Sequence, residues 1–305
     1  MKSLNKAGIN LFLGILAVST ASLLIRKAQG TLPSTVIAAG RLISATLILA
    51  PFGGKRALRE FFALPRAQRS PIILAGFFLG IHFLVWIISL EMTSVASSVI
   101  LVTTTPIWVA LFSPLVLKET ITRNVMLGLM IAMLGIVVLF LGPQGGAQGG
   151  TFDWRSLLGN FLALVGAWMA AAYTMVGRKV RDALPLKSYV FLVNGVAALV
   201  AATAALPDLG KCNLTWLGGI PWVFLLGLIP QVIGHTLFNV AVRQMDAVYA
   251  SIALLGEPIG SIILAWIFLS EKPGRYDLLG GLFVIAGILL AFLYKPVSDT
   301  DHTTG

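Results

Sequence analysis

Residues 251–272 read SIALLGEPIGSIILAWIFLSEK. Apart from Glu257 and Pro258, the stretch is apolar for about twenty residues, which is the length of a helix that crosses a bilayer core. A carboxylate in hydrocarbon is costly unless it is paired, protonated or hydrated, and a proline removes a backbone donor and bends a helix. The stretch therefore predicts a membrane helix that is interrupted near its middle and carries a charge there.

The composition of the whole chain agrees with a membrane protein. Of its 305 residues, 57% are hydrophobic and 11% are charged, whereas roughly a quarter of the residues in soluble domains are charged. The net charge of +10 comes from basic residues in short loops, where such residues set orientation. We therefore expect a lipid bilayer and a small molecule as partners, with no nucleic acid, and a monomer or homodimer.

Cofactors and metals are not expected. Cys212 is the single cysteine, which excludes disulfides within the chain and thiolate metal sites. His302 lies in a polar tail, so only His82 and His235 fall in apolar segments.

The apolar residues form an all-α integral membrane pattern of ten candidate spans. We read the first as an uncleaved span rather than a signal peptide, because no clear cleavage site precedes a soluble domain. The ten ranges are 8–25, 33–52, 71–90, 93–116, 124–142, 156–177, 186–206, 218–241, 247–269 and 276–294.

The two halves of the chain align at a constant offset of 152 residues. Thr105-Pro106 falls on Glu257-Pro258, and Glu119 falls on Glu271. Arg26, Pro33, Gly128 and Gly135 find matching residues at the same offset. A common offset over nearly the whole chain indicates a duplication. The predicted domains are a first five-helix repeat at 1–142, a linker at 143–152, a second repeat at 153–296 and a disordered tail at 297–305.

An odd number of spans in each half makes the two repeats inverted. With the N-terminus inside, most Lys and Arg residues fall on the inner side, including five in residues 53–70. The positive-inside rule then predicts a multi-pass protein of the inner (plasma) membrane with both termini in the cytoplasm.

These motifs resemble the EamA family of the drug/metabolite transporter superfamily. LVLKETITRNVMLGLMIAMLGIVVLFL at 115–141 recurs as IFLSEKPGRYDLLGGLFVIAGILLAFL at 267–293, and the likeness extends over about residues 8–295. The resemblance implies a ten-helix inverted-repeat carrier with a central cavity, often an exporter of amino acids or related metabolites. It does not identify a substrate.

Polar and aromatic residues at depth mark the predicted cavity, because ionisable groups inside spans line pathways or form internal pairs. Four of them form two pairs whose members are four residues apart, His82 with Trp86 and His235 with Asn239, so each pair shares one helix face. At the offset of 152 the second pair is one residue out of strict register with the first. The full set is Arg41, His82, Trp86, Trp168, Asn194, His235, Asn239 and Glu257. The predicted kink or gating positions are Pro106, Gly256, Pro258 and Gly260.

Glu257 has two interpretations. It recognises substrate or couples transport to protons, or it only pairs with Arg41. Arg41 retains its proton and needs an anion at mid-membrane, supplied either by Glu257 or by a substrate carboxylate or phosphate. Because Thr105 stands opposite Glu257 in the repeat, the proline belongs to the architecture and the carboxylate is the specialised addition.

The leading functional prediction is a secondary-active carrier, not an enzyme, that exports an amino acid or a similar small metabolite by alternating access. Proton coupling is a hypothesis that rests on Glu257 and the histidines. A membrane-embedded enzyme or a channel stays open as an alternative. No Walker A motif is present, so the chain does not bring its own ATP drive.

Overall fold

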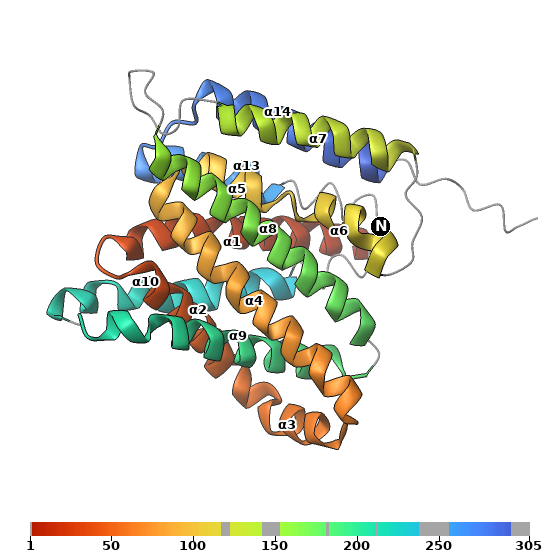
Figure 1. Ribbon diagram of the computed structural model, residues 1–305. Coiled ribbons are helices and arrows are strands. Elements are labelled where there is room, and N and C mark those ends of the chain that lie inside the picture. The colour runs from red at the N-terminus through yellow and green to blue at the C-terminus, as the bar shows by residue number, and fades with distance from the viewer. Residues whose placement is uncertain are drawn as a thin grey trace, which may run out of the picture.

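The computed structural model describes residues 2–116, 123–141, 153–180, 183–211, 213–237 and 256–293, and within these ranges every regular element is a helix (Figure 1). The first half contains α1 (Lys2–Gln29), α2 (Ser34–Leu49), η1 (Ala50–Phe52), α3 (Gly54–Ala63), α4 (Arg66–Met92), α5 (Val95–Val102), α6 (Thr105–Val116) and α7 (Arg123–Leu141). The second half contains α8 (Trp154–Val180), α9 (Leu186–Leu209), η2 (Leu214–Gly218), α10 (Ile220–Leu226), η3 (Gly227–Gly234), α13 (Gly256–Leu269) and α14 (Arg275–Leu293).

Eight helical segments of the described chain are long and apolar enough to cross a membrane. Each coincides with one of the first eight predicted spans, from Ile9–Gln29 to Ile220–Leu237. The apolar helix α13 is shorter in its described part. Together with α14, it falls within the last two predicted ranges.

The short helix α3 was not predicted, because its ten residues include four charged ones and were read as a loop. It packs against α9 with Ala57 fully buried. The Ser188 hydroxyl of α9 donates to Glu60 at 2.5 Å, and the Arg56 guanidinium donates to the same carboxylate at 2.7 Å. These two donors hold the pKa of Glu60 below its usual value. The basic segment is thus attached to the helix bundle.

Helices from opposite halves of the chain pack together. The long helix α4 lies between α8 and α9, α2 packs on α9, and α1 packs on α13 and η3. The pair α7 and α14 lies at one edge of the molecule, and α3 lies at the opposite end (Figure 1). The first half is therefore not a separate bundle beside the second.

Glycines bring α7 and α14 into close contact. A Cβ atom on Gly128 would lie 2.5 Å from the carbonyl oxygen of Gly287, and one on Gly135 would lie 2.6 Å from that of Gly280. The order of these contacts makes the helices antiparallel. At the offset of 152, Gly128 corresponds to Gly280 and Gly135 to Gly287, so exchanging the two halves turns one contact into the other.

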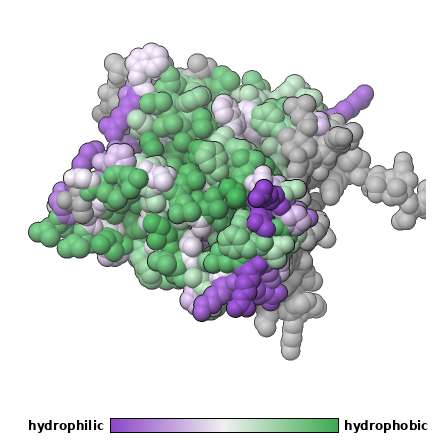
Figure 2. Space-filling model, turned by 60° about the horizontal axis from the view of Figure 1, so that its bottom comes forward, coloured by the Kyte–Doolittle hydropathy of each residue, from purple (hydrophilic) through white to green (hydrophobic). Residues whose placement is uncertain are grey.

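The outer surface carries many large apolar side chains. Figure 2 shows a broad hydrophobic face with hydrophilic residues gathered toward its edges. Leu199, Leu206, Ile267 and Leu282 are each more than 60% exposed. Such a surface suits contact with lipid chains, which solvate apolar groups where water does not.

Candidate functional site

The fourth predicted span is interrupted where the sequence placed a kink. Helix α5 ends at Val102, the turn Thr103–Thr104 follows, and α6 begins at Thr105 with Pro106 as its second residue. A proline in the first turn of a helix sacrifices no hydrogen bond, because the first N–H groups have no partner there.

The equivalent position in the second half lies in α13, whose described part begins at Gly256 and continues with Glu257 and Pro258. Residues 238–255 lie outside the described chain, so the predicted interruption of this span is not described. Gly256 packs on Ile15 of α1, and Gly260 packs on Ser19 of the same helix.

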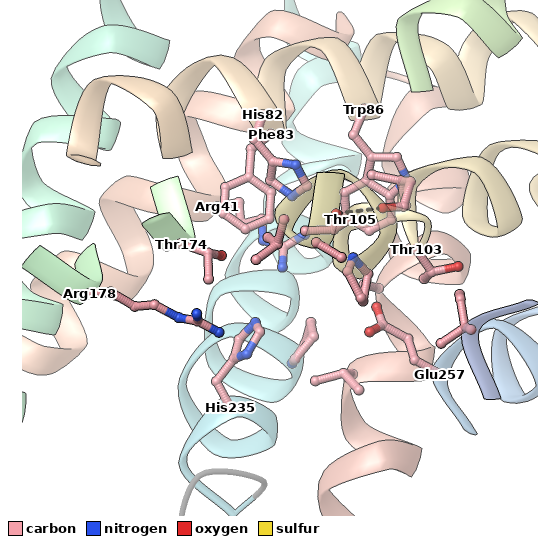
Figure 3. A pocket seen from close by; sticks show the side chains of 18 residues that line it. Arg41, His82, Phe83, Trp86, Thr103, Thr105, Thr174, Arg178, His235 and Glu257 are labelled. Carbon is pink, nitrogen blue, oxygen red and sulfur yellow. Dashed lines mark hydrogen bonds between the residues drawn. The ribbon is translucent and has the colours of Figure 1, made fainter. Parts of the chain in front are cut away.

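A cavity of about 510 Å³ lies next to the start of α6 and the described beginning of α13 (Figure 3). Apolar side chains form part of its wall, among them Val102, Val109 and Ile288. Its polar lining comes from five helices, the turn after α5 and the residue after η3, and comprises Arg41, His82, Thr103, Thr105, Thr174, Arg178, His235 and Glu257. The volume lies in the range of small-molecule sites, about 300–1,000 Å³.

The structure brings five of the eight predicted cavity residues to one cavity, together with one predicted kink position. The five are Arg41, His82, Trp86, His235 and Glu257, and the kink position is Pro106. Asn239 lies outside the described residues. Trp168 is not in the lining and packs edge-on against Trp108, with ring centroids 5.3 Å apart.

Asn194 also lies outside the cavity lining, and it reaches Arg41 through a residue that the sequence analysis did not select. The Arg41 Nε donates to Gln231 Oε1 at 2.9 Å, and Gln231 Nε2 donates to Asn194 Oδ1 at 3.1 Å. Asn194 Nδ2 in turn donates to the Val190 carbonyl at 2.9 Å. Gln231 carries no charge and lies in an apolar stretch, so the search for ionisable groups inside the spans did not identify it.

One feature of the sequence could have pointed to the region of Gln231. The pair His235–Asn239 is shifted by one residue from the position that the offset of 152 predicts from His82–Trp86. Residues 227–234 form a π-helix, the form that a helix takes when it holds one extra residue per turn. His235 follows directly, one position beyond strict register with His82. The same analysis missed Phe83, Thr174 and Arg178, which line the cavity.

Arg41 is 2% exposed and lies against aromatic rings. Its guanidinium carbon is 4.1 Å from the centroid of the Phe83 ring and 5.6 Å from that of Trp86. Both distances fit cation–π contacts, which are strongest where water is excluded. The Arg41 Nη1 atom is buried and has no protein partner in the described structure.

Arg41 and Glu257 face the same cavity without forming an ion pair in the described structure (Figure 3). The backbone oxygen of Glu257 accepts from the Ser19 hydroxyl at 3.2 Å, which attaches this helix start to α1. A cation and a carboxylate therefore both remain directed at the cavity.

His82 is oriented by its neighbours. Its Nδ1 lies 2.9 Å from the Gly166 carbonyl oxygen, and because a carbonyl only accepts, Nδ1 must carry the proton. The ring stacks on Trp86 at 6.1 Å between centroids. In the neutral ring, Nε2 is left as an acceptor for a cavity ligand.

A second cluster of charges joins the end of α1 to the start of α5 and the α13–α14 connection. Arg26 Nη2 donates to Glu271 Oε2 at 3.2 Å and to the Thr93 carbonyl at 3.1 Å. Glu271 also accepts from the Val95 N–H. We call Arg26, Thr93, Val95 and Glu271 the end cluster.

A bundle of apolar helices with a charged cavity beside an interrupted span is typical of a polytopic membrane protein. The EamA-like transporter family matches residues 5–141 and 157–293, so the chain belongs to this family. The family and its named relatives point to a multi-pass membrane transporter with a small-molecule substrate rather than to an enzyme.

The relatives span most of the chain. It is 28% identical over 238 residues to the uncharacterized transporter YdfC of Bacillus subtilis (strain 168), which covers 75% of this chain and 74% of that one. An uncharacterized transporter of Archaeoglobus fulgidus is 24% identical over 254 residues, 82% of this chain and 84% of its own length. One solved crystal structure has a TM-score of 0.61 at 19% identity, covers 95% of this chain and 97% of its own, and shares the fold.

Proposed function

We propose that the protein is a secondary-active transporter that exports an amino acid or a similar small metabolite by alternating access. It lies in the inner membrane with both termini in the cytoplasm. Ten spans form two inverted five-helix repeats, at 1–142 and 153–296. The predicted linker 143–152 and the predicted tail 297–305 lie outside the described residues. The duplication and the positive-inside pattern support this arrangement.

The antiparallel contact of α7 with α14 supports inversion of the repeats. An axis in the membrane plane that exchanges the halves makes equivalent helices antiparallel, whereas an axis along the membrane normal would leave them parallel. The exchange of the Gly128–Gly287 contact with the Gly135–Gly280 contact fits the first kind of axis.

The observation that carries the substrate class is the pair of opposite charges that face one cavity without neutralising each other. A zwitterion such as an amino acid brings a carboxylate for Arg41 and an ammonium group for Glu257. The apolar wall of Val102, Val109 and Ile288 would receive its side chain. Buried charges that lack a partner are destabilising, so the ligand would supply what the empty site lacks.

Alternating access is supported by the different environments of the equivalent arginines Arg26 and Arg178. Arg26 closes the end cluster with Glu271, about one quarter exposed on both side chains. Arg178 is exposed and lines the cavity together with the exposed His235. We infer a cavity that is reached from the side of Arg178 and closed by the end cluster. Pro106, Gly256, Pro258 and Gly260 are the proposed pliable positions.

The test is transport by purified protein in liposomes, with and without an imposed pH gradient, for wild type and Glu257→Gln. We expect the variant to fold, to lose gradient-driven accumulation and to exchange substrate more weakly, because it lacks both the titratable group and the carboxylate proposed to bind the ammonium group. Equal flux with and without the gradient in the wild type would reject proton coupling. Normal transport by a well-folded variant would remove Glu257 from the mechanism.

A further inference from the structure

Two buried donors of the cavity-lining side chains lack a partner. Arg41 Nη1 and Trp86 Nε1 are both buried without a hydrogen-bond acceptor in the described structure. Their side chains are 2% and 4% exposed, both line the cavity, and the Arg41 guanidinium carbon is 5.6 Å from the centroid of the Trp86 ring (Figure 3). Unmet buried donors of this kind are rare in native proteins, so both are suited to an acceptor group that a ligand brings.

The opposite edge of the guanidinium is held by a chain of amides whose directions are fixed. Because arginine only donates, Gln231 must turn its oxygen toward Arg41 Nε. Its NH₂ group then faces Asn194, whose oxygen accepts, and the Asn194 NH₂ donates to the Val190 carbonyl. Each side-chain amide thus donates and accepts one bond, and the chain links α2, η3 and α9 without adding a charge.

The repeat shows that this chain of amides is not part of the common architecture. At the offset of 152, Arg41 corresponds to Val193, Gln231 to Leu79 and Asn194 to Leu42. Those counterparts are apolar and buried, so the fold is built in the other half without any polar network here. The asymmetry indicates a specialised role for the three residues.

From these observations the structure assigns Gln231 as the positioning residue of a carboxylate-binding site. Gln231 occupies Arg41 Nε with a neutral acceptor, and Arg41 Nη1 is left without a partner in the described structure. Arg41 Nη1 and Trp86 Nε1 then receive the carboxylate of an organic acid, and the apolar wall receives its carbon skeleton. This assignment rests on the proposed function and names the group by which the same cavity recognises its substrate.

Replacing Gln231 by glutamate separates positioning from a structural role, because it changes charge with almost no change in shape. The new carboxylate would pair with Arg41 in advance and compete with the ligand. We expect Gln231→Glu to melt at or above the wild-type temperature while it binds carboxylates about tenfold or more weakly, the range for one charged hydrogen bond. A structural role predicts that stability and binding fall together.

The binding probes are leucine, 4-methylpentanoate, which lacks the amine, and leucinamide, which lacks the carboxylate. Each is titrated against purified protein, and the shift in melting temperature is recorded. We expect shifts with the first two in the wild type and none with leucinamide. If leucinamide acts as leucine does, or if neither acid produces a shift, the carboxylate site is refuted.

Asn194→Asp adds the same charge one residue further from the guanidinium and provides a graded comparison. We expect it to weaken carboxylate binding less than Gln231→Glu does; an effect equal to that of Gln231→Glu would overturn the role of the Nε contact. If Gln231→Glu fails to fold, Gln231→Met is the deciding variant, because methionine has a side chain of similar length but lacks the oxygen that accepts from Arg41 Nε. It should weaken carboxylate binding, and unchanged binding refutes the assignment.

The probes also distinguish this inference from the proposed function. A response to 4-methylpentanoate without one to leucine would keep the carboxylate site and reject amino acids as the substrate class. A response to both acids in a protein that fails to transport leucine would keep the site and reject the proposed transport of that amino acid.

Discussion

Gly128→Ala should destabilise the protein, because the added methyl group has no room between α7 and α14. The new Cβ would lie 2.5 Å from the Gly287 oxygen, against 3.4 Å at which ordinary contact begins, a shortfall of about 0.9 Å. Overpacking of this kind costs about 1–3 kcal/mol, and the helix preference of alanine returns about 0.5–1 kcal/mol. We expect a net loss of about 1–2 kcal/mol in the free energy of unfolding.

The assay is denaturant unfolding in detergent micelles, followed by circular dichroism. Gly287→Ala alters the same contact from the other helix and should cost a similar amount. Gly195→Ala is the control, because its nearest neighbour would be Thr46 Cγ2 at 3.8 Å, an ordinary contact. It should be neutral or stabilise by up to about 1 kcal/mol. Equal stability of Gly128→Ala and Gly195→Ala would refute the close packing of α7 with α14.

Two further predictions concern the ends of the bundle. Glu271→Gln should weaken the end cluster and so expose the cavity, whose lining includes Ala21. A membrane-impermeant maleimide added from the outside should then label Ala21→Cys faster, measured in a Cys212→Ser background; an unchanged rate would argue against a closure there. The lowered pKa of Glu60 means that its bond with Ser188 contributes stability at neutral pH that is lost as the pH falls through the folded-state pKa. The melting-temperature difference between wild type and Ser188→Ala should therefore be largest at pH 7 and shrink below about pH 4, and a constant difference would contradict this.

The first eight predicted spans coincide with long apolar helices of the described chain, because the length of an apolar block reflects the bilayer. The sequence also predicted the interruption at Pro106, since proline acts locally on its own helix. Helix α3 escaped prediction because ten amphipathic residues have the composition of a loop until Ala57 is seen against α9.

The candidate site was predicted in part. Charge at depth identified Arg41 and Glu257, which line the cavity. Helical spacing shows which residues share a face but not which way the face turns, so Asn194 was expected in the cavity and instead lies outside its lining, hydrogen-bonded to Gln231. The orientation of the Gln231 side chain depends on the π-helix that contains it. The register change in that π-helix results from packing between helices rather than from any residue type.

The glycine contact between α7 and α14 has a consequence for the origin of the chain. The two helices contact each other through equivalent surfaces, as in the isologous interface of a symmetric dimer. Under the proposed inverted duplication, two copies of a single half, inserted in opposite directions, would meet through this same surface before any linker joined them. One of the surfaces between the present halves would then be one by which an unfused half recognised its own copy.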